Sequence, residues 1–211
     1  MCIRDRYHYG SKISHKNLKI ELLDNPSHLE LASPVVNGYL KSIQENIIKN
    51  NAINKSMSII THGDASFSGQ GIVSELFNMK NLEPYDIGGT IHIVVNNQIG
   101  FTTNPDETKS NGYCTDIAKA YNIPIIHVNA DDVESCLNVA NLAYQYKMTF
   151  QKDILIDLVG YRRHGHNEGD EPSFTQPLMY KKISNHPRLK EIYKNKLINI
   201  HGNGIEKLKN Q

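Results

Sequence analysis

Apolar positions along the chain follow two spacings, one typical of buried strands and one typical of amphipathic helices. Four short apolar or β-branched runs have the length of buried strands, at 57–61, 90–97, 123–129 and 154–161. The segments before and between them carry apolar residues on one helical face and predict helices over 35–49, 71–80, 114–121 and 132–150. We expect two further short helices to close the chain. This alternation predicts an α/β fold, a parallel sheet with helices on both faces.

Polar side chains follow each predicted strand at the point where it ends. In open parallel sheets, ligands bind outside the carboxyl ends of the strands. The residues at those ends are His62-Gly63-Asp64, Asn96-Asn97-Gln98, His127-Val128-Asn129 and Tyr161-Arg162-Arg163. A purely structural domain needs turn residues there, but not so many groups that suit metals and phosphates. The pattern therefore predicts a ligand site at this edge of the sheet.

Asp64 and Asn97 follow two strands that we expect to be neighbours in the sheet. Carboxylate and carboxamide oxygens are hard ligands that suit Mg²⁺, which proteins usually share with substrate phosphates. Gly69 and Gly71 allow the backbone to approach a ligand closely where the next helix begins. The N–H groups at that helix start favour an anion. Together these residues predict a diphosphate held through Mg²⁺.

Length and charge narrow the class of protein without specifying a chemistry. The 211 residues suit one domain or a large piece of a longer protein. The net charge of +1 gives no sign of binding to nucleic acid or to an anionic membrane surface. We find no secretory signal and no apolar run of the roughly 18 residues that a membrane span needs. Three scattered cysteines fit a reducing cytoplasm, and the Lys-, Asn- and Ile-rich composition indicates a bacterial source.

Long strings of the sequence resemble one family of enzymes. GDASFSGQG followed by NNQIG is similar to the thiamine diphosphate motif, a Gly-Asp pair with Asn-Asn further along the chain. The strings that narrow the family are NPSHLELASPVVNGYL, GGTIHIVVNNQIGFTT, YCTDIAKA, HVNADDVES and DLVGYRRHGHNEGDEPSFTQPLMYKKI. They resemble the decarboxylating first component of 2-oxoglutarate dehydrogenase over residues 7–195. The resemblance implies a thiamine diphosphate-binding fold, the diphosphate-binding domain of a transketolase-like enzyme.

The resemblance also implies roles for individual residues. Asp64, Asn97 and the backbone carbonyl of Ile99 would be the Mg²⁺ ligands. His8 and His166 would be catalytic, His8 near the 2-oxo acid and His166 on an active-site loop that contacts the diphosphate in related enzymes. The residues implied to contact the cofactor are Asp64, Ala65, Gly69, Asn97, Ile99 and His166.

Several nearby residues receive other interpretations. Arg162 and Arg163 share the loop of His166, and their guanidinium groups suit carboxylate or phosphate. His62 and His127 end strands near the expected cofactor, so they remain secondary candidates. We expect His92, which alternates with apolar neighbours, to be packed and not catalytic.

The implied reaction is the oxidative decarboxylation of 2-oxoglutarate with transfer of a succinyl group to a lipoyl arm, a step of the tricarboxylic acid cycle. The implied partners are the lipoylated dihydrolipoamide succinyltransferase component and, at full length, a second copy of the chain. We expect residues 1–6 to be a non-native junction and residues 196–211 to form a flexible end. The family's pyrimidine-binding domain is expected to be absent, so the chain alone is expected to be inactive.

Three alternatives stay open on the sequence alone. The first is the sister enzyme that acts on 2-oxoadipate, since one methylene is worth only ~1–3 kcal/mol of discrimination. The second is a metallohydrolase that binds a softer metal through His62, Asp64, His127 and His166. The third is a non-catalytic fragment that only docks to other subunits.

Overall fold

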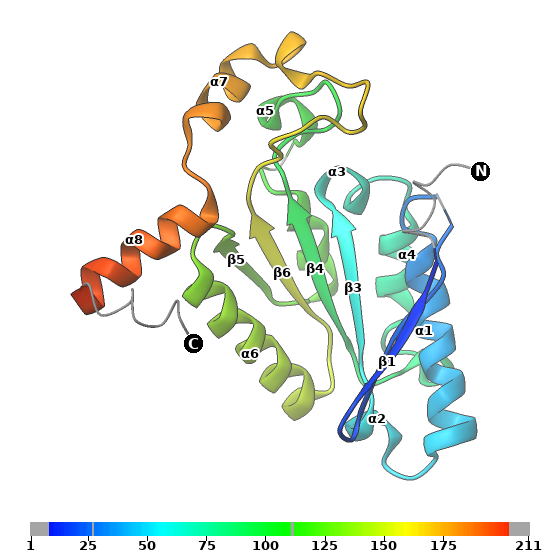
Figure 1. The fold of residues 1–211 in the computed structure, drawn as a ribbon. Coiled ribbons are helices and arrows are strands. Elements are labelled where there is room, and N and C mark those ends of the chain that lie inside the picture. Colours follow the sequence, from blue (N-terminus) through cyan, green and yellow to red (C-terminus); the bar gives the residue numbers. More distant parts are fainter. Residues whose placement is uncertain (1–8, 27, 111, 203–211) are drawn as a thin grey trace.

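Four parallel strands form the central sheet of the chain (Figure 1). The computed structural model describes residues 9–26, 28–110 and 112–202. The strands are β3 (Ser58–Gly63), β4 (Thr90–Asn96), β5 (Ile125–Asn129) and β6 (Ile154–Val159), and their order in the sheet is β3-β4-β6-β5. All neighbouring pairs are parallel. The predicted α/β class and the four predicted strands are therefore confirmed.

The main helices before and between the strands of the sheet also lie where the apolar spacing predicts them. They are α1 (Ala32–Ile43) with its π-helical continuation η2 (Gln44–Ile48), α4 (Ile72–Met79), η4 (Cys114–Tyr121) and α6 (Val133–Phe150). Helix α1 begins at Ala32 and not at residue 35. Pro34 is tolerated in its first turn, because the backbone N–H groups of a first turn make no hydrogen bond within the helix. The segment η4 is a 3₁₀ helix and not an α-helix.

Two helices follow the sheet, α7 (Pro177–Asn185) and α8 (Leu189–His201). Helix α7 lies beyond the carboxyl ends of the strands, and α8 extends away from the sheet (Figure 1). Helix α8 continues past residue 195, where we expected the folded domain to end. The run LKEIYKNKLINIH holds no Gly or Pro, so no helix breaker occurs before Gly202.

Each face of the sheet packs against its own apolar cluster. On one face, Phe67, Phe77 and Val94 belong to a buried cluster that joins the sheet to α4 and η4. On the other face, Ala143 of α6 packs in a cluster with Ile156 of β6. The carboxyl ends of the strands project beyond both clusters, which leaves that edge free for polar residues.

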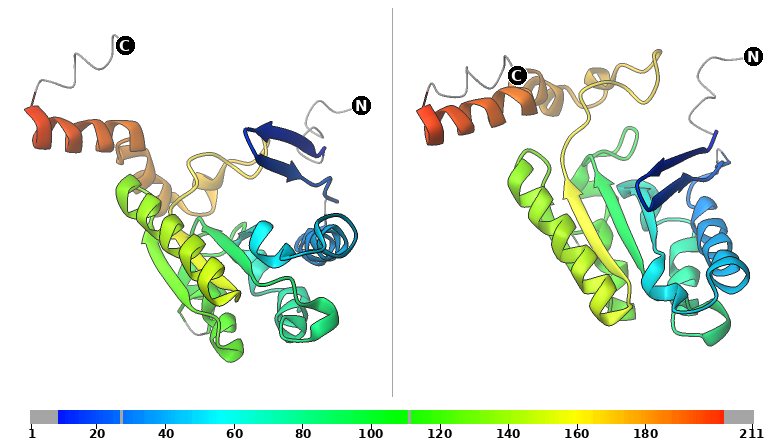
Figure 2. Two further views of the ribbon diagram at one scale, coloured as in Figure 1. Left: turned by 90° about the horizontal axis from the view of Figure 1, so that it is seen from below. Right: turned by 60° about the horizontal axis from the view of Figure 1, so that its bottom comes forward.

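An antiparallel hairpin outside the sheet was not predicted. It consists of β1 (Ser11–His15) and β2 (Leu18–Leu22), and every residue of both strands is exposed. The hairpin lies beside α1 (Figure 2), where the Tyr39 hydroxyl donates to Glu21 at 2.9 Å. The remaining short elements are α2 (Ala52–Lys55), α3 (Asp64–Phe67), η3 (Glu83–Tyr85), α5 (Pro105–Thr108) and η5 (Pro172–Phe174).

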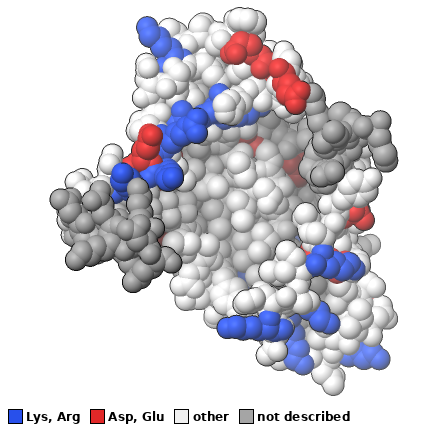
Figure 3. Space-filling view, in the orientation of Figure 1, with Lys and Arg blue, Asp and Glu red and all other residues white. Residues whose placement is uncertain are grey.

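Part of the sheet face that carries α6 is not covered by the described residues. Ile59 of β3 and Val95 of β4 point to this face and are 51% and 42% exposed. In the space-filling view this region is a hollow with few charged side chains inside it (Figure 3). Among the described helices we find none with the length and apolarity that crossing a bilayer requires.

Candidate cofactor and metal site

Asp64 and Asn97 follow two neighbouring strands of the sheet. Strand β3 ends at Gly63, which pairs with Val95 of β4, so the two strands end side by side. Asp64 is the first residue of α3 and is only 3% exposed. Asn97 comes directly after the last residue of β4. The fold therefore brings these two predicted metal ligands to the same edge of the sheet.

Two asparagines shape the turn that carries the third predicted ligand. Oδ1 of Asn96 accepts the backbone N–H of Gln98, and Oδ1 of Asn97 accepts that of Ile99, both at 3.1 Å. Gln98 has a left-handed φ of 62°, and its side-chain amide donates to the Gly160 carbonyl at 2.7 Å. A carboxamide oxygen has two lone pairs, so Asn97 keeps one for a metal while it orients Ile99.

A glycine-rich turn connects α3 to α4. Gly71 is the N-cap of α4 and has a left-handed φ of 79°, which glycine adopts at little cost. The Gly71 N–H donates to the Gly69 carbonyl at 2.7 Å, which closes the turn. Because glycine offers no side chain to cap the helix, the first-turn N–H groups of α4 remain suited to an anion. Ala65, another predicted cofactor contact, is exposed on α3.

A lysine lies beside the predicted metal ligand Asp64. Nζ of Lys109 is 3.5 Å from Oδ2 of Asp64, and the two side chains are 11% and 4% exposed. Sequence reasoning missed Lys109, because no local pattern distinguishes one lysine within a polar loop.

His166 lies on the loop after β6. Its ring packs edge-on against Phe101, with 6.5 Å between the ring centroids. Phe101 belongs to the loop that starts at Asn97, so the fold brings the two predicted cofactor loops together. His8, the other histidine predicted to be catalytic, lies outside the described residues.

Asp170 stabilises the loop of His166 through contacts within that loop. Its Oδ2 accepts the backbone N–H of His166 at 2.8 Å and lies 3.9 Å from Nη2 of Arg162. The backbone of Asp170 also passes close to Gly165, where a Cβ would overlap the Asp170 carbonyl oxygen. The position of His166 therefore depends on a carboxylate and a glycine next to it.

Arg163 binds the end of α7 and not an anion. Its Nη1 donates to the Ile183 carbonyl at 3.0 Å. Its Nη2 donates to the carbonyls of His186 and Pro187 at 2.8 and 2.9 Å. The guanidinium carbon also lies 5.2 Å from the Tyr161 ring centroid. The expectation that Arg163 faces an anionic ligand was wrong, because the carbonyls of Ile183, His186 and Pro187 engage its guanidinium.

His62 and His92 form a buried chain with Glu30. Nδ1 of His62 lies 2.5 Å from Glu30, and its Nε2 lies 3.0 Å from Nδ1 of His92. Burial raises the pKa of Glu30, but hydrogen bonds from His62 and Ser66 and the charge of His62 lower it more, so it lies below its usual value. Burial holds the pKa of His92 well below its usual value. His92 is packed, as predicted, and both ring nitrogens of His62 are engaged inside the protein.

His127 is oriented by a buried carboxylate. Its Nδ1 lies 2.7 Å from Oδ2 of Asp157, while Nδ2 of Asn96 donates to Oδ1 of Asp157 at 3.1 Å. The ring of Tyr113 packs on His127, with 4.4 Å between centroids. Asp157 was missed, although an acid inside the apolar run ILIDLV is a signal that the sequence contains. His127 lines a cavity of about 410 Å³ at the sheet edge.

The ligand set of a metallohydrolase does not assemble. Within residues 9–26, 28–110 and 112–202, no group of three or more His, Cys, Asp or Glu side chains could hold a metal. His62 and His127 lie on β3 and β5, which are opposite edge strands of the sheet. Imidazole ligands at opposite edges cannot share one ion, so this alternative was wrong.

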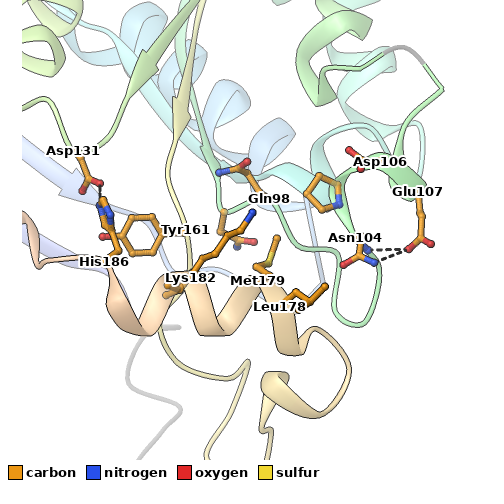
Figure 4. A pocket seen from close by; sticks show the side chains of 13 residues that line it. Gln98, Asn104, Asp106, Glu107, Asp131, Tyr161, Leu178, Met179, Lys182 and His186 are labelled. Atoms are coloured by element: carbon orange, nitrogen blue, oxygen red, sulfur yellow. Dashed lines mark hydrogen bonds and ion pairs between the residues drawn. The ribbon is translucent and has the colours of Figure 1, made fainter.

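A cavity of about 670 Å³ adjoins the Asn97 end of the site (Figure 4). It lies between α7 and the segment that follows β4. Lys182 of α7 points across it toward Gln98, and His186 pairs with Asp131 at 2.7 Å. The other polar side chains that line it are Asn97, Asn104, Asp106, Glu107 and Tyr161. The mixed lining provides room for a polar ligand beside the predicted metal ligands.

Comparisons with known proteins agree with this arrangement. A 2-oxoglutarate dehydrogenase E1 component of Bacillus cereus strain G9842 is 52% identical over 200 residues, which cover 91% of this chain and 21% of that protein. Proteins of the same name from Bacillus cereus strain B4264 and Bacillus anthracis strain A0248 are 51% identical over the same shares. The chain thus spans about a fifth of the length of these relatives.

The model of one protein family covers nearly all of the chain. It is described as the dehydrogenase E1 component, and it matches residues 4–210. The matched region includes both strand ends, the glycine-rich turn and the loop of His166. The chain belongs to the dehydrogenase E1 component family.

Proposed function

We propose that the chain forms the diphosphate- and Mg²⁺-binding part of a thiamine diphosphate-dependent enzyme that decarboxylates 2-oxoglutarate. The observation that carries the proposal is the placement of Asp64 and Asn97 at the carboxyl ends of adjacent parallel strands. Relatives named 2-oxoglutarate dehydrogenase E1 component support the substrate.

The donors at the sheet edge fit a hard, oxygen-binding metal ion. Asp64 supplies a buried carboxylate, Asn97 a carboxamide oxygen, and Ile99 a backbone carbonyl in a turn that Asn97 orients. These are oxygen ligands of the kind that Mg²⁺ takes while it keeps positions for phosphate oxygens. The N-terminus of α4 after Gly71 provides N–H groups for the diphosphate.

The chain's own residues would position the cofactor and exclude water from it. Bound thiamine diphosphate supplies the electron sink that 2-oxo acid decarboxylation needs. Asp64 and Asn97 would fix the metal end, and the His166 ring packs edge-on against Phe101 of the loop that follows Asn97. The cavity next to Asn97 offers space for polar groups near this end.

The wider assembly follows from the proposed reaction. A succinyl group would pass to the lipoyl arm of a dihydrolipoamide succinyltransferase component, and the full-length protein would pair with a second copy. Residues beyond this chain would supply the pyrimidine half of the cofactor site. We therefore expect the chain by itself to be inactive.

The test uses this chain completed on both sides to the length of its relatives, called here the completed protein. Ferricyanide reduction is followed with thiamine diphosphate and Mg²⁺ on 2-oxoglutarate, 2-oxoadipate and pyruvate. We expect turnover with 2-oxoglutarate, and a loss of about 100-fold or more in Asp64→Ala, since even outer partners of a metal ligand contribute 10–100-fold. The control is Glu45→Ala, a surface carboxylate that pairs with Lys41 far from the strand ends.

Each outcome has a distinct meaning. Preference for 2-oxoadipate would keep the cofactor and overturn the substrate. Full activity of Asp64→Ala would overturn the metal site. Absence of turnover with every 2-oxo acid by a folded protein would refute the proposed activity.

A further inference from the structure

Lys109 makes a shielded ion pair with a carboxylate that the proposed function assigns to a metal. Its Nζ lies 3.5 Å from Oδ2 of Asp64, and its side chain is 11% exposed. Asp64 is 3% exposed, so water screens this pair poorly. The lysine ammonium therefore balances the charge of the Asp64 carboxylate.

The packing of the segment that contains α5 holds Lys109 in this position. Asn104 and Glu107 form a capping box at the start of α5, which ends at Thr108. Thr108 lies against Gly100, because a Cβ on Gly100 would come within 3.2 Å of the Thr108 methyl group. The same Cβ would lie 3.8 Å from Cβ of Ala65, the neighbour of Asp64 in α3. Lys109 follows Thr108 directly, so its path toward Asp64 is set by packing and not by chance exposure.

A divalent cation on Asp64 would meet the ammonium of Lys109 at short range. The metal ion and the ammonium, both positively charged and next to the same carboxylate, repel each other strongly where little water screens them. The lysine ammonium can move away from the carboxylate, because it is carried by a flexible four-carbon side chain and can donate three hydrogen bonds elsewhere. The displaced ammonium needs a nearby anion, because an unpaired charge in a shielded place is costly.

We propose that Lys109 competes with a divalent cation for the Asp64 carboxylate, and that its ammonium pairs with the cofactor diphosphate when Mg²⁺ holds Asp64. The proposal rests on the proposed function, in which Asp64 is a metal ligand. Lys109 is then a cofactor-binding residue with opposite effects on two equilibria. It opposes the binding of metal alone, and it favours the binding of diphosphate in the presence of metal.

The test measures the two equilibria separately in the completed protein. Mn²⁺ affinity without cofactor is measured by electron paramagnetic resonance, and thiamine diphosphate affinity at saturating Mg²⁺ by titration calorimetry. In Lys109→Met we expect Mn²⁺ to bind about 3-fold tighter or more, because a competing charge is gone. We expect thiamine diphosphate to bind about 10-fold weaker or more, the loss of one charged hydrogen bond.

Two further variants separate this role from a structural one. Lys109→Arg keeps the charge, and we expect it to retain most of the cofactor affinity; Lys109→Gln repeats the test if the Met variant does not fold. Lys119→Met is the matched control, because Lys119 also pairs with an acid, Asp116 at 2.6 Å, but its own side chain is 63% exposed. Neither affinity should change in that control.

The outcomes distinguish the proposal from its foundation. If Lys109→Met weakens both metal and cofactor in parallel, or leaves either affinity unchanged, Lys109 is a structural ion pair and the proposal fails. If the unsubstituted protein binds neither Mn²⁺ nor thiamine diphosphate, the proposed function itself fails, whatever the variants do.

Discussion

Nε2 of His62 lies 3.0 Å from Nδ1 of His92, and both rings are buried on the same face of the adjacent parallel strands β3 and β4. The ring centroids are 5.2 Å apart and the planes differ by 24°, so the imidazoles are stacked. On the far side of His62, Glu30 completes a chain of three titratable groups. Because these hydrogen-bonded groups can titrate, the stability of β3 and β4 depends on their protonation.

We predict that β3 and β4 lose stability as pH falls below about 6.5, the usual pKa of histidine. Burial, and then the charges of His62 and Lys80, hold the pKa of folded His92 well below that value. The unfolded chain therefore binds a proton that the folded chain does not, so unfolding becomes easier with acid. One such proton changes the free energy of opening by about 1.4 kcal/mol per pH unit. Hydrogen exchange of the β4 amides at several pH values measures this slope.

The matched variants for the pH experiment are His92→Asn and His15→Asn. Asparagine at position 92 keeps a polar amide near the position of Nδ1 but cannot titrate, so the slope should fall. His15 is exposed in the hairpin, and its replacement should leave the slope unchanged. Equal slopes in the unsubstituted protein and in His92→Asn would contradict the prediction.

Gly165→Ala should weaken thiamine diphosphate binding with little effect on overall stability. A Cβ at this position overlaps the Asp170 carbonyl oxygen, so the loop that carries His166 must shift. A shift of that loop should lower cofactor affinity by about 10-fold or more, since small misplacements of a positioned group cost this much. Titration calorimetry with the completed protein measures the affinity.

Gly169→Ala is the control on the same loop. Its added Cβ would lie 3.5 Å from Oδ1 of Asn167, an ordinary contact. We expect its cofactor affinity to stay within about 2-fold of the unsubstituted value, a change of under 0.5 kcal/mol. If both alanine variants bind equally well, close packing at Gly165 does not position the loop.

Lys147→Met should lower the thermal stability of the sheet and α6. The Lys147 side chain is fully buried, and its Nζ donates to the carbonyls of Ile53 and Ser56 at 3.0 and 2.9 Å. Its removal leaves two part-buried carbonyls without these donors and should cost about 1–3 kcal/mol. Lys55→Met is the control, because Lys55 is exposed and its ammonium donates to the Asn50 carbonyl. Thermal denaturation that shows equal losses in both variants would disprove the role of Lys147.

Arg163→Met should destabilise the C-terminal end of α7 without unfolding the sheet. The guanidinium holds three carbonyls there and stacks on Tyr161, so its loss should speed hydrogen exchange near Ile183 by about 10-fold or more. Lys181→Met, on the exposed side of the same helix, should leave exchange unchanged. Unaltered exchange in Arg163→Met would mean that apolar packing alone holds the helix end.

Local sequence patterns were enough for the strands, most helices and the edge at which polar groups gather. Strand and helix spacing is a local property, so the runs around Ile60 and Val94 could be recognised without any knowledge of their neighbours. The hairpin of β1 and β2 was missed because its apolar residues stay exposed and its alternation is short. The mistaken interpretation of Arg163 as an anion ligand arose because the position of α7 above the sheet is not a local property.

The sequence by itself determined the α/β class, the motif residues Asp64, Asn97 and Gly71, and the family resemblance. Only the tertiary structure decided the strand order β3-β4-β6-β5 and the partners of buried charges. Lys109 and Asp64 are 45 residues apart, and His62 and Glu30 are 32 apart. Such pairs form because a buried charge must find a partner wherever the packed chain supplies one, and no local periodicity encodes which distant residue that is.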